Sequence, residues 1–406
     1  MTLPLEGLRV LDFGQGVAGP YCGQHLGDHG ADVIKIEPPR GDWARTMGAQ
    51  DGSGLSGTFV AVNRNKRGLC LDLRKPEAVD ITRRLAARAD VVVESFRPGV
   101  MDRMGLGREA LRRDNAGVVF CSVTGFGESG PNVDLPAGDS VMQAYGGLMS
   151  IIGERDGDPL RVGNVVSDML AGTNAFSGVL LALLTRATSG KGGDVHVSLL
   201  DSIVAFQAPP LTEFLLTGKT PLRLGNDHPL IAPSGAVRTS DGRINFTVFD
   251  HQWPAFCGAL GLQRIAADPR FENSGGRQKN RDALNRELAT IFAARSSAQW
   301  IEALREMDVL CAPINDYPAL IQDAQVRHNE VFASVDDAAQ RALPMVRNPI
   351  RFDSHPPRHC APPRLGEHTR QILRSDLGLD EKSVAQLMAA NIAMGAAAPD
   401  LATATR

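Results

Sequence analysis

Buried apolar runs alternate with helix-like segments through the first two hundred residues, and this pattern constrains the fold more than any other feature. Continuous runs of Val, Ile and Leu are typical of strands that are covered on both faces of a sheet. Such strands are expected at 8–14, 31–37, 68–73, 90–96, 117–127 and the start of 194–206. Because helical segments such as 76–89 separate them, the sequence predicts an α/β fold with a doubly wound, Rossmann-like parallel sheet.

The pattern changes after about residue 215. The segment 225–253 has the turn residues and short apolar runs of loops and short strands, and two helices are expected at 279–294 and 297–307. Further on, 345–353 resembles a strand and 366–392 resembles two helices, while the tail 394–406 has no periodicity and is expected to be flexible. We therefore predict a large domain, a smaller α+β domain and a C-terminal segment, with the limits 1–224, 225–330 and 331–406.

Composition argues against several function classes. A net charge of −3 gives no reason to expect nucleic acid or an anionic membrane as a partner. The six cysteines are widely separated and lack CxxC or cysteine–histidine spacing, so we expect no metal site and reduced thiols in the cytoplasm. The N-terminus does not resemble a signal peptide, and the longest apolar stretch, 178–186, is too short to span a bilayer.

A glycine-rich turn follows the first predicted strand. Gly14, Gly16 and Gly19 have the GxGxxG spacing of a dinucleotide-binding loop, and Glu37 ends the next strand, where an NAD site places its ribose-binding acid. Against NAD, Pro20 follows the third glycine directly and basic residues lie close to Glu37. The turn could equally be a tight strand-to-helix connection, or could hold another anionic ligand such as a CoA phosphate.

One carboxylate stands alone in an apolar segment. Between Arg161 and Arg186 the single ionisable side chain is Asp168, where an extended run gives way to a helix. Local sequence favours a helix N-cap, which is a common use of aspartate. A shielded carboxylate could also act as a nucleophile.

Six segments, in the same order, resemble the family III CoA-transferases (the CaiB/BaiF family, a superfamily that includes formyl-CoA transferase and 2-methylacyl-CoA racemase). The resemblance spans essentially the whole chain. Its segments are "PLEGLRVLDFGQGVAGPYCGQHLGDHGADVIKIEPPRGD", "NRNKRGLCLDLRKPE", "VVVESFRPGVMDRMGLG", "TGFGESGP", "GDSVMQAYGGLMSIIG" and "SGKGGDVHVSLLDS".

The resemblance implies a fold, an assembly and a reaction. The implied fold is a large Rossmann-like domain, completed by the returning C-terminus, with a smaller domain inserted and two chains interlocked as a homodimer. The implied reaction moves CoA from an acyl-CoA to a small carboxylic acid, with CoA as substrate and no permanently bound cofactor or metal. Asp168 aligns with the family nucleophile, and Asp139 aligns with an accessory carboxylate whose alternative role is an N-cap for a helix at 140–150.

The resemblance also implies substrate contacts. Gln15 is carried over as a contact of the reacting acid, and so is His228 in "GNDHPLIAPSG", where turn structure is an equal alternative. The implied CoA contacts are Val17, Ala18, Leu71, Asp72, Leu73, Arg74, Ser95, Phe96, Arg97, Arg103, Pro136, Ala137 and Gly138. Arg74, Arg97 and Arg103 are the expected phosphate partners, because guanidinium binds phosphate bidentately.

Two other functions remain open. The racemases of this superfamily carry His before the accessory acid, as one of two bases that exchange the α-proton. Here Gly138 precedes Asp139, so an acyl-CoA racemase or epimerase is the second interpretation. A non-catalytic protein that binds acyl-CoA or NAD is the third. Transferases often carry an aromatic residue at the position of Gly138, so its absence leaves the shape of the acyl site open.

Overall fold

A computed structural model describes residues 3–49, 55–337, 340–353 and 359–396. The predicted flexible tail, 394–406, lies mostly outside these ranges. Two compact units are present: the first comprises Met1–Leu148, Arg161–Leu216 and Glu330–Arg406, and the second comprises Met149–Leu160 and Thr217–Asn329. The domain limits at 224/225 and 330/331 stay a prediction.

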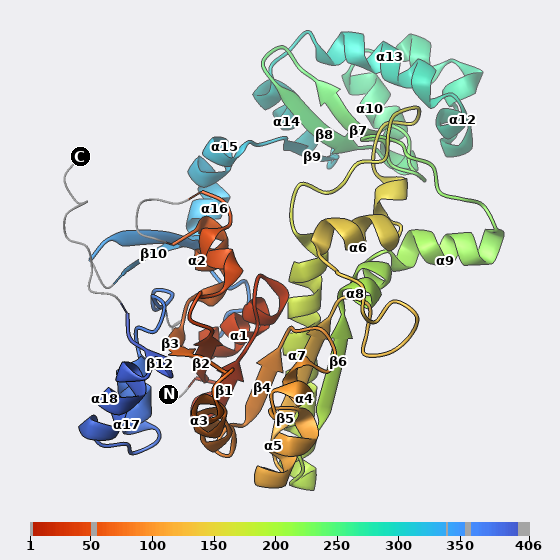
Figure 1. The fold of residues 1–406 in the computed structure, drawn as a ribbon. Helices are drawn as coiled ribbons and strands as arrows, with labels where there is room; N and C mark the ends of the chain where they lie inside the picture. Colours follow the sequence, from red (N-terminus) through yellow and green to blue (C-terminus); the bar gives the residue numbers. More distant parts are fainter. Residues whose placement is uncertain (1–2, 50–54, 338–339, 354–358, 397–406) are drawn as a thin grey trace. The chain divides into compact units, whose positions relative to one another are not determined.

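The first unit contains a seven-stranded sheet in the order β12-β3-β2-β1-β4-β5-β6 (Figure 1). Every neighbouring pair from β3 to β6 is parallel, whereas β12 is antiparallel to β3. The strands are β1 (Arg9–Asp12), β2 (Asp32–Glu37), β3 (Lys66–Leu71), β4 (Val91–Glu94), β5 (Val119–Thr124), β6 (Asp194–Ser198) and β12 (Ala393–Met394). The mainly parallel α/β sheet is therefore confirmed, and its chain order reverses between β1 and β4.

Strand alternation divides each strand's side chains between two helical layers. Leu11 of β1 joins a core with residues of α3 (Pro76–Ala86), α5 (Arg108–Asp114) and α17 (Thr369–Ser375). The other face packs against α1 (Ala18–Asp28) and α7 (Val166–Ser189). Ile372 and Ala393 belong to the same core as Leu11, so the C-terminal segment completes this layer. The remaining helices of the unit are η1 (Trp43–Thr46), α2 (Gly57–Asn63), α4 (Val100–Arg103), α6 (Asp139–Tyr145), α8 (Leu199–Phe206), α9 (Ala208–Thr217) and α18 (Glu381–Ala389), while η2 (Leu148–Ile151) falls at the sequence boundary between the two units.

Close packing between α1 and α7 depends on Gly172. A Cβ at this position would lie 2.7 Å from the carbonyl oxygen of Ala18 and 3.0 Å from the side chain of Tyr21. The glycine therefore lets the second turn of α7 approach the first turn of α1, which brings Asp168, one turn earlier in α7, to the same region as the start of α1.

The strand expected at 345–353 is wrong in its limits. A two-stranded antiparallel sheet pairs β10 (Phe332–Asp336) with β11 (Ala342–Val346), so the strand ends where the prediction begins. Asn348 follows it, and its side-chain amide donates to Asp28 Oδ2 at 2.9 Å instead of continuing a ladder. Pro349 also lacks the N–H that a strand needs.

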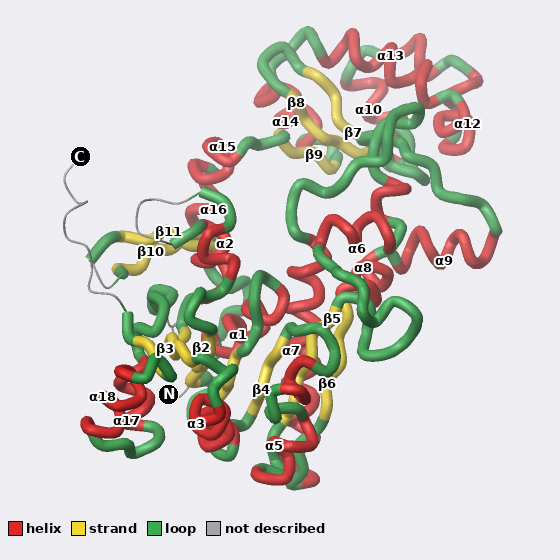
Figure 2. Tube along the Cα trace, viewed as in Figure 1, coloured by secondary structure: helices red, strands yellow, loops and turns green. Residues whose placement is uncertain are grey.

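The second unit has a three-stranded antiparallel sheet of β7 (Ser234–Arg238), β8 (Arg243–Thr247) and β9 (Leu310–Pro313) (Figure 2). Its core combines Phe246 of β8 with aromatic and aliphatic residues of helices such as α13 (Arg281–Phe292) and α14 (Ser297–Arg305). The other helices between residues 250 and 328 are η3 (Asp250–Gln252), α10 (Trp253–Ala259), α11 (Gln263–Ala266), η4 (Pro269–Phe271), α12 (Ser274–Lys279), α15 (Tyr317–Gln322) and α16 (Ala324–His328).

Helix α7 extends well beyond the apolar run 178–186. Its 24 residues are long and apolar enough to cross a membrane by length and composition, so the argument from a short apolar run was wrong. A third of its most apolar window is buried in the protein. Among the described residues, α8 and α9 meet the criterion only as a pair bent by 72°.

Candidate active site

A cavity of 830 Å³ lies within the first unit, at the carboxyl ends of the parallel strands. Its walls include the segments that follow β1, β4 and β5, together with the starts of α6 and α7. The site therefore lies where the strand order reverses, which is the usual ligand position in a doubly wound sheet. The N-termini of α1 and α7 both face it at Val17 and Val165, and helix N-termini favour anionic ligands.

Close packing explains the glycines of the first loop. Gly16 has φ +77°, and a Cβ there would lie 2.1 Å from the Trp43 ring. At Gly14 a Cβ would lie 2.7 Å from Pro20 and 2.8 Å from the Asp12 carboxylate. These residues therefore allow a tight turn beside the indole and do not by themselves indicate a dinucleotide.

Buried charged side chains bind the backbone of the loop at Gly14–Gly16. Lys35 Nζ donates to the Gly14 carbonyl at 2.8 Å and to Asp42 at 2.9 Å, and Asp42 in turn accepts from the Gly16 N–H at 2.9 Å. Lys66 Nζ pairs with Asp12 at 2.8 Å. All four side chains are fully buried. Burial would raise the pKa of Asp12, but Lys66 and Lys35 outweigh it and hold that pKa below its ordinary value.

Glu37 is not available to a ribose. Its two carboxylate oxygens accept from Arg45 at 2.7 and 2.6 Å, and one also accepts from the Asp42 N–H at 2.9 Å. The carboxylate is therefore already satisfied within the protein, which removes the main support for NAD binding.

Asp168 reaches the cavity from the first turn of α7. Among the residues that the structure describes, its carboxylate has no hydrogen-bond or ion-pair partner. Burial, and secondarily the charge of Asp139, raise the pKa of Asp168 from 3.8 to about 7. A carboxylate that is poorly solvated and unpaired is a better nucleophile than one in water.

Asp139 is held firmly behind Asp168. Its Oδ1 accepts from the backbone N–H of Ser167 at 2.9 Å and from the Ser167 hydroxyl at 2.8 Å. Its Oδ2 accepts from Gln143 Nε2 at 2.7 Å. These three donors hold both oxygens of Asp139, so the position of this carboxylate next to the first turn of α7 is fixed.

Both helix-cap interpretations are wrong. The N-cap of α7 is Val165 and that of α6 is Gly138, and neither helix has a side-chain cap from its own aspartate. Asp139 instead satisfies the second backbone N–H of α7, a helix remote from it in sequence. A cap from another helix leaves no local sequence signal.

Comparisons with known proteins identify the family of this chain. The family model described as CoA-transferase family III matches residues 5–369. The chain belongs to CoA-transferase family III. A succinate–glutarate CoA-transferase of Agrobacterium fabrum is 36% identical over 379 residues, which cover 91% of this chain and 95% of that protein. A succinyl-CoA:glutarate CoA-transferase of Mus musculus is 33% identical, with 96% and 90% covered. A CAIB/BAIF family protein from Brucella suis has a similar structure, with a TM-score of 0.85, 35% identity, and 93% and 100% of the two chains covered.

This CoA-transferase brings eleven of the expected site residues to one cavity. From the first loop to the start of α7 they are Gln15, Val17, Ala18, Ser95, Phe96, Arg97, Pro136, Ala137, Gly138, Asp139 and Asp168. Sequence order alone does not say how close these residues lie, but the sheet topology places the ends of β1 and β4 next to each other.

Six expected residues do not line the cavity. Leu71 is fully buried in the sheet core, and Leu73 packs against that core. Arg74 forms a two-pronged pair with Asp72, and Arg103 is exposed on α4. His228 belongs to the second unit, where its Nδ1 accepts from the Leu230 N–H at 3.1 Å and so stabilises a turn. A contact of His228 with the substrate stays a prediction.

The cavity wall also contains residues that sequence reasoning missed. Trp43, Phe126, Arg161 and Asn164 are among them. Phe126 lies within a segment that carried the family resemblance and Trp43 directly follows another, whereas Arg161 lies in a loop without a recognisable motif. Gly138 is an open point in the wall: its backbone is extended (φ −174°), and a Cβ would meet no atom within 4 Å.

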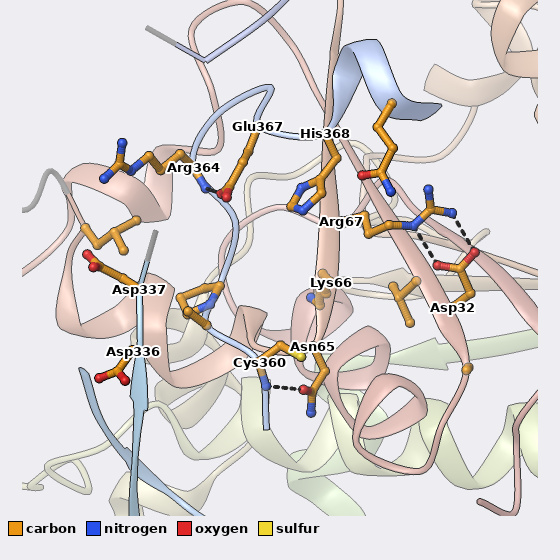
Figure 3. A pocket seen from close by; sticks show the side chains of 16 residues that line it. Asp32, Asn65, Lys66, Arg67, Asp336, Asp337, Cys360, Arg364, Glu367 and His368 are labelled. Carbon is orange, nitrogen blue, oxygen red and sulfur yellow. Dashed lines mark hydrogen bonds and ion pairs between the residues drawn. The ribbon is translucent and has the colours of Figure 1, made fainter. Parts of the chain in front are cut away.

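A second cavity, of 380 Å³, borders β2 and β3 and is separate from this site (Figure 3). Arg67 pairs with Asp32 and Asp376, and Cys360 N–H donates to Asn65, so much of its polar wall is internally satisfied. Burial lowers the pKa of His368, whose Nδ1 accepts from the Gly68 N–H. No cluster suited to a metal ion occurs within the described ranges.

Proposed function

We propose that this family III CoA-transferase moves CoA from an acyl-CoA to a small carboxylic acid through covalent intermediates on Asp168. The observation that carries the proposal is the unpaired Asp168 carboxylate, with its raised pKa, in the cavity that also contains most of the expected CoA contacts. The two relatives described above are named for transfer between succinate or succinyl-CoA and glutarate, so these acids are the first candidates for this chain.

The proposed reaction has four balanced steps. The Asp168 carboxylate attacks the donor thioester, which forms a mixed anhydride and releases CoA thiolate. The thiolate attacks the aspartyl carbonyl, which forms an aspartyl-CoA thioester and releases the donor acid. The acceptor carboxylate then attacks this thioester and displaces CoA thiolate, which finally attacks the acceptor's carbonyl and restores Asp168. No step needs ATP, because thioesters and carboxylates are exchanged for others of similar energy.

Asp139 is proposed as the positioning residue for this nucleophile. It fixes the first turn of α7 through Ser167, the residue next to Asp168. Its charge also contributes to the raised pKa of Asp168, which makes the carboxylate more basic and more nucleophilic. Gln143 donates to Asp139 and to the Asn164 carbonyl, so the same residues hold the adjoining wall.

Trapping with hydroxylamine tests the covalent mechanism. After incubation with succinyl-CoA and hydroxylamine, we expect mass spectrometry to find a hydroxamate on Asp168, because hydroxylamine attacks either acylated form. Asp201, an exposed acid on α8, is the internal control and should stay unmodified. Turnover of succinyl-CoA and glutarate with an unmodified Asp168 would contradict the mechanism.

The geometry gives the racemase less support. Exchange of an α-proton needs an acid and a base on opposite faces of the substrate. The described residues that line the cavity include no histidine, and Gly138 occupies the position before Asp139. Incorporation of deuterium from solvent at the α-carbon of a 2-methylacyl-CoA would favour the racemase.

We also propose that the enzyme is a cytoplasmic homodimer. Apolar side chains lie exposed along α7, α8 and α9: Leu181, Leu184, Phe206, Leu215 and Leu216 are between 53% and 81% exposed. So many large apolar groups on consecutive helices of one unit are typical of a protein interface. All six cysteines are free thiols, which supports a reducing compartment.

Charge placed on α7 tests the dimer. The double substitution Leu181→Arg and Leu184→Arg should shift the mass measured by light scattering from two chains to one, because these side chains are one helical turn apart. Glu77→Arg, at an exposed position of α3, should leave the dimer intact. If the wild-type protein is instead a monomer that co-floats with lipid vesicles in a density gradient, the apolar surface of α7, α8 and α9 binds a membrane.

A further inference from the structure

We propose that Arg161 binds the far carboxylate of a dicarboxylic acid whose other carboxyl group reacts at Asp168. This inference rests on the proposed reaction and defines the class of acid that the cavity accepts. The cationic side chains among the described lining residues are Arg97 and Arg161. Within the described ranges, the guanidinium of Arg161 has no hydrogen-bond or ion-pair partner.

The backbone next to Arg161 is tied to the reacting end of the cavity. Gln143, which is fully buried, accepts from the Val162 N–H at 2.8 Å and donates to the Asn164 carbonyl at 3.1 Å. The same Gln143 amide donates to Asp139, and Asp139 holds Ser167 beside Asp168. One buried hydrogen-bond network therefore fixes the Arg161 loop and the nucleophile together.

The cavity that contains both groups is open at Gly138. A Cβ there, next to Asp139, would meet nothing within 4 Å, so the wall leaves space at this point. Asp168 and Asp139 are the acidic residues of the described wall, and the oxygens of Asp139 are already occupied. Arg161 is an exposed residue of the cavity wall, so its guanidinium is open to a carboxylate of the substrate.

Two other partners for Arg161 fit less well. One alternative partner is the reacting carboxylate of the acid, which must attack a carbonyl carbon. A tight ion pair with Arg161 would reduce the nucleophilicity of this carboxylate. The phosphates of CoA are at the opposite end of the pantetheine arm from the thioester, and therefore far from Asp168 during reaction. Arg97, beyond the end of β4, is the better candidate for CoA.

Binding of a matched pair of acyl-CoAs tests this inference. Succinyl-CoA and butyryl-CoA have acyl chains of the same length, but the succinyl chain ends in a carboxylate and the butyryl chain ends in a methyl group. Calorimetric titration uses the Asp168→Asn background, so that neither ligand reacts. Arg161→Gln should weaken succinyl-CoA binding about 10- to 100-fold, as expected for a lost charge-assisted pair, and leave butyryl-CoA binding unchanged. Arg161→Lys should restore part of the difference.

Arg97→Gln is the matched control, because it removes the same charge from the same cavity and should weaken both acyl-CoAs equally. Equal weakening by Arg161→Gln would overturn the inference and assign Arg161 to CoA. No effect on either ligand, or a succinyl-specific effect at Arg97 instead, would overturn it as well. A preference for succinyl-CoA that needs Arg161, in a protein whose Asp168 forms no hydroxamate, would keep the binding site and reject the proposed chemistry.

Discussion

Replacing Asp168 with asparagine is expected to lower the rate of CoA transfer by about 10³-fold or more while making the folded protein more stable at neutral pH. The rate falls because the amide cannot form the anhydride on which every later step depends. CoA transfer from succinyl-CoA to glutarate, followed by chromatography of the acyl-CoAs, measures the loss. The exposed Asp201→Asn is the control and should retain full activity.

The stability gain follows from the raised pKa. Since burial, and then Asp139, raise the pKa of Asp168 from 3.8 to about 7, the folded state binds this proton more tightly than the unfolded state. Stability from this group is therefore lost as pH rises from about 4 to about 7, and stays lost above pH 7. At about 1.4 kcal/mol per pKa unit the limit is about 4 kcal/mol, and partial solvation makes about 1 to 3 kcal/mol the expected gain.

Thermal unfolding at two pH values checks this reasoning. Asp168→Asn should raise Tm by a few degrees at pH 8 and have little effect at pH 4, where Asp168 is neutral in the folded state and only partly ionised in the unfolded chain. Equal shifts at both pH values would mean that the substitution acts through packing and not through the charge. A stable but inactive variant also excludes unfolding as the cause of lost activity.

Periodicity predicted the sheet because its strands are buried on both faces. The runs 31–37 and 90–96 coincide closely with β2 and β4, and the chain order of a doubly wound sheet follows from right-handed crossovers. The strand at 345–353 failed because its apolar residues continue past β11, where Asn348 turns its amide to Asp28. A tertiary hydrogen bond of this kind leaves no periodic trace.

The surroundings of Asp168 were only partly predictable. Family resemblance singled out Asp168 and Asp139, but the contact that joins them runs from Asp139 to Ser167, between separate helices. Leu71 matched a CoA-contact position and is a core residue, because a strand's alternation turned its side chain into the sheet core. Arg161 was missed because the cavity wall in which it lies is formed by several elements at once.

Breaking the buried pair of Lys66 and Asp12 is expected to have the largest effect on stability. Lys66→Met should cost about 3 to 5 kcal/mol, because it leaves the Asp12 carboxylate buried with one fewer partner. Burial already lowers the pKa of Lys66 to about 8, with Asp12 acting against it, so this ammonium depends on its acceptors. They include Asp12, the Pro20 carbonyl and Asn63 Oδ1, at 2.7 to 2.9 Å.

A double-mutant cycle separates this charge effect from packing. Adding Asp12→Asn to Lys66→Met should recover a large part of the loss, since the remaining amide can still accept from the Gly14 N–H without a buried charge. The exposed pair of Arg83 and Asp114 is the control, and Arg83→Met should cost less than about 1 kcal/mol. Hydrogen exchange of the β1 and β3 amides gives the free energies of unfolding within this unit.

Losses of stability that simply add in the double variant would show that the two buried side chains contribute separately. A coupling free energy between Lys66 and Asp12 would mean that their ion pair stabilises the loop at Gly14. This loop leads into the residues that line one wall of the cavity.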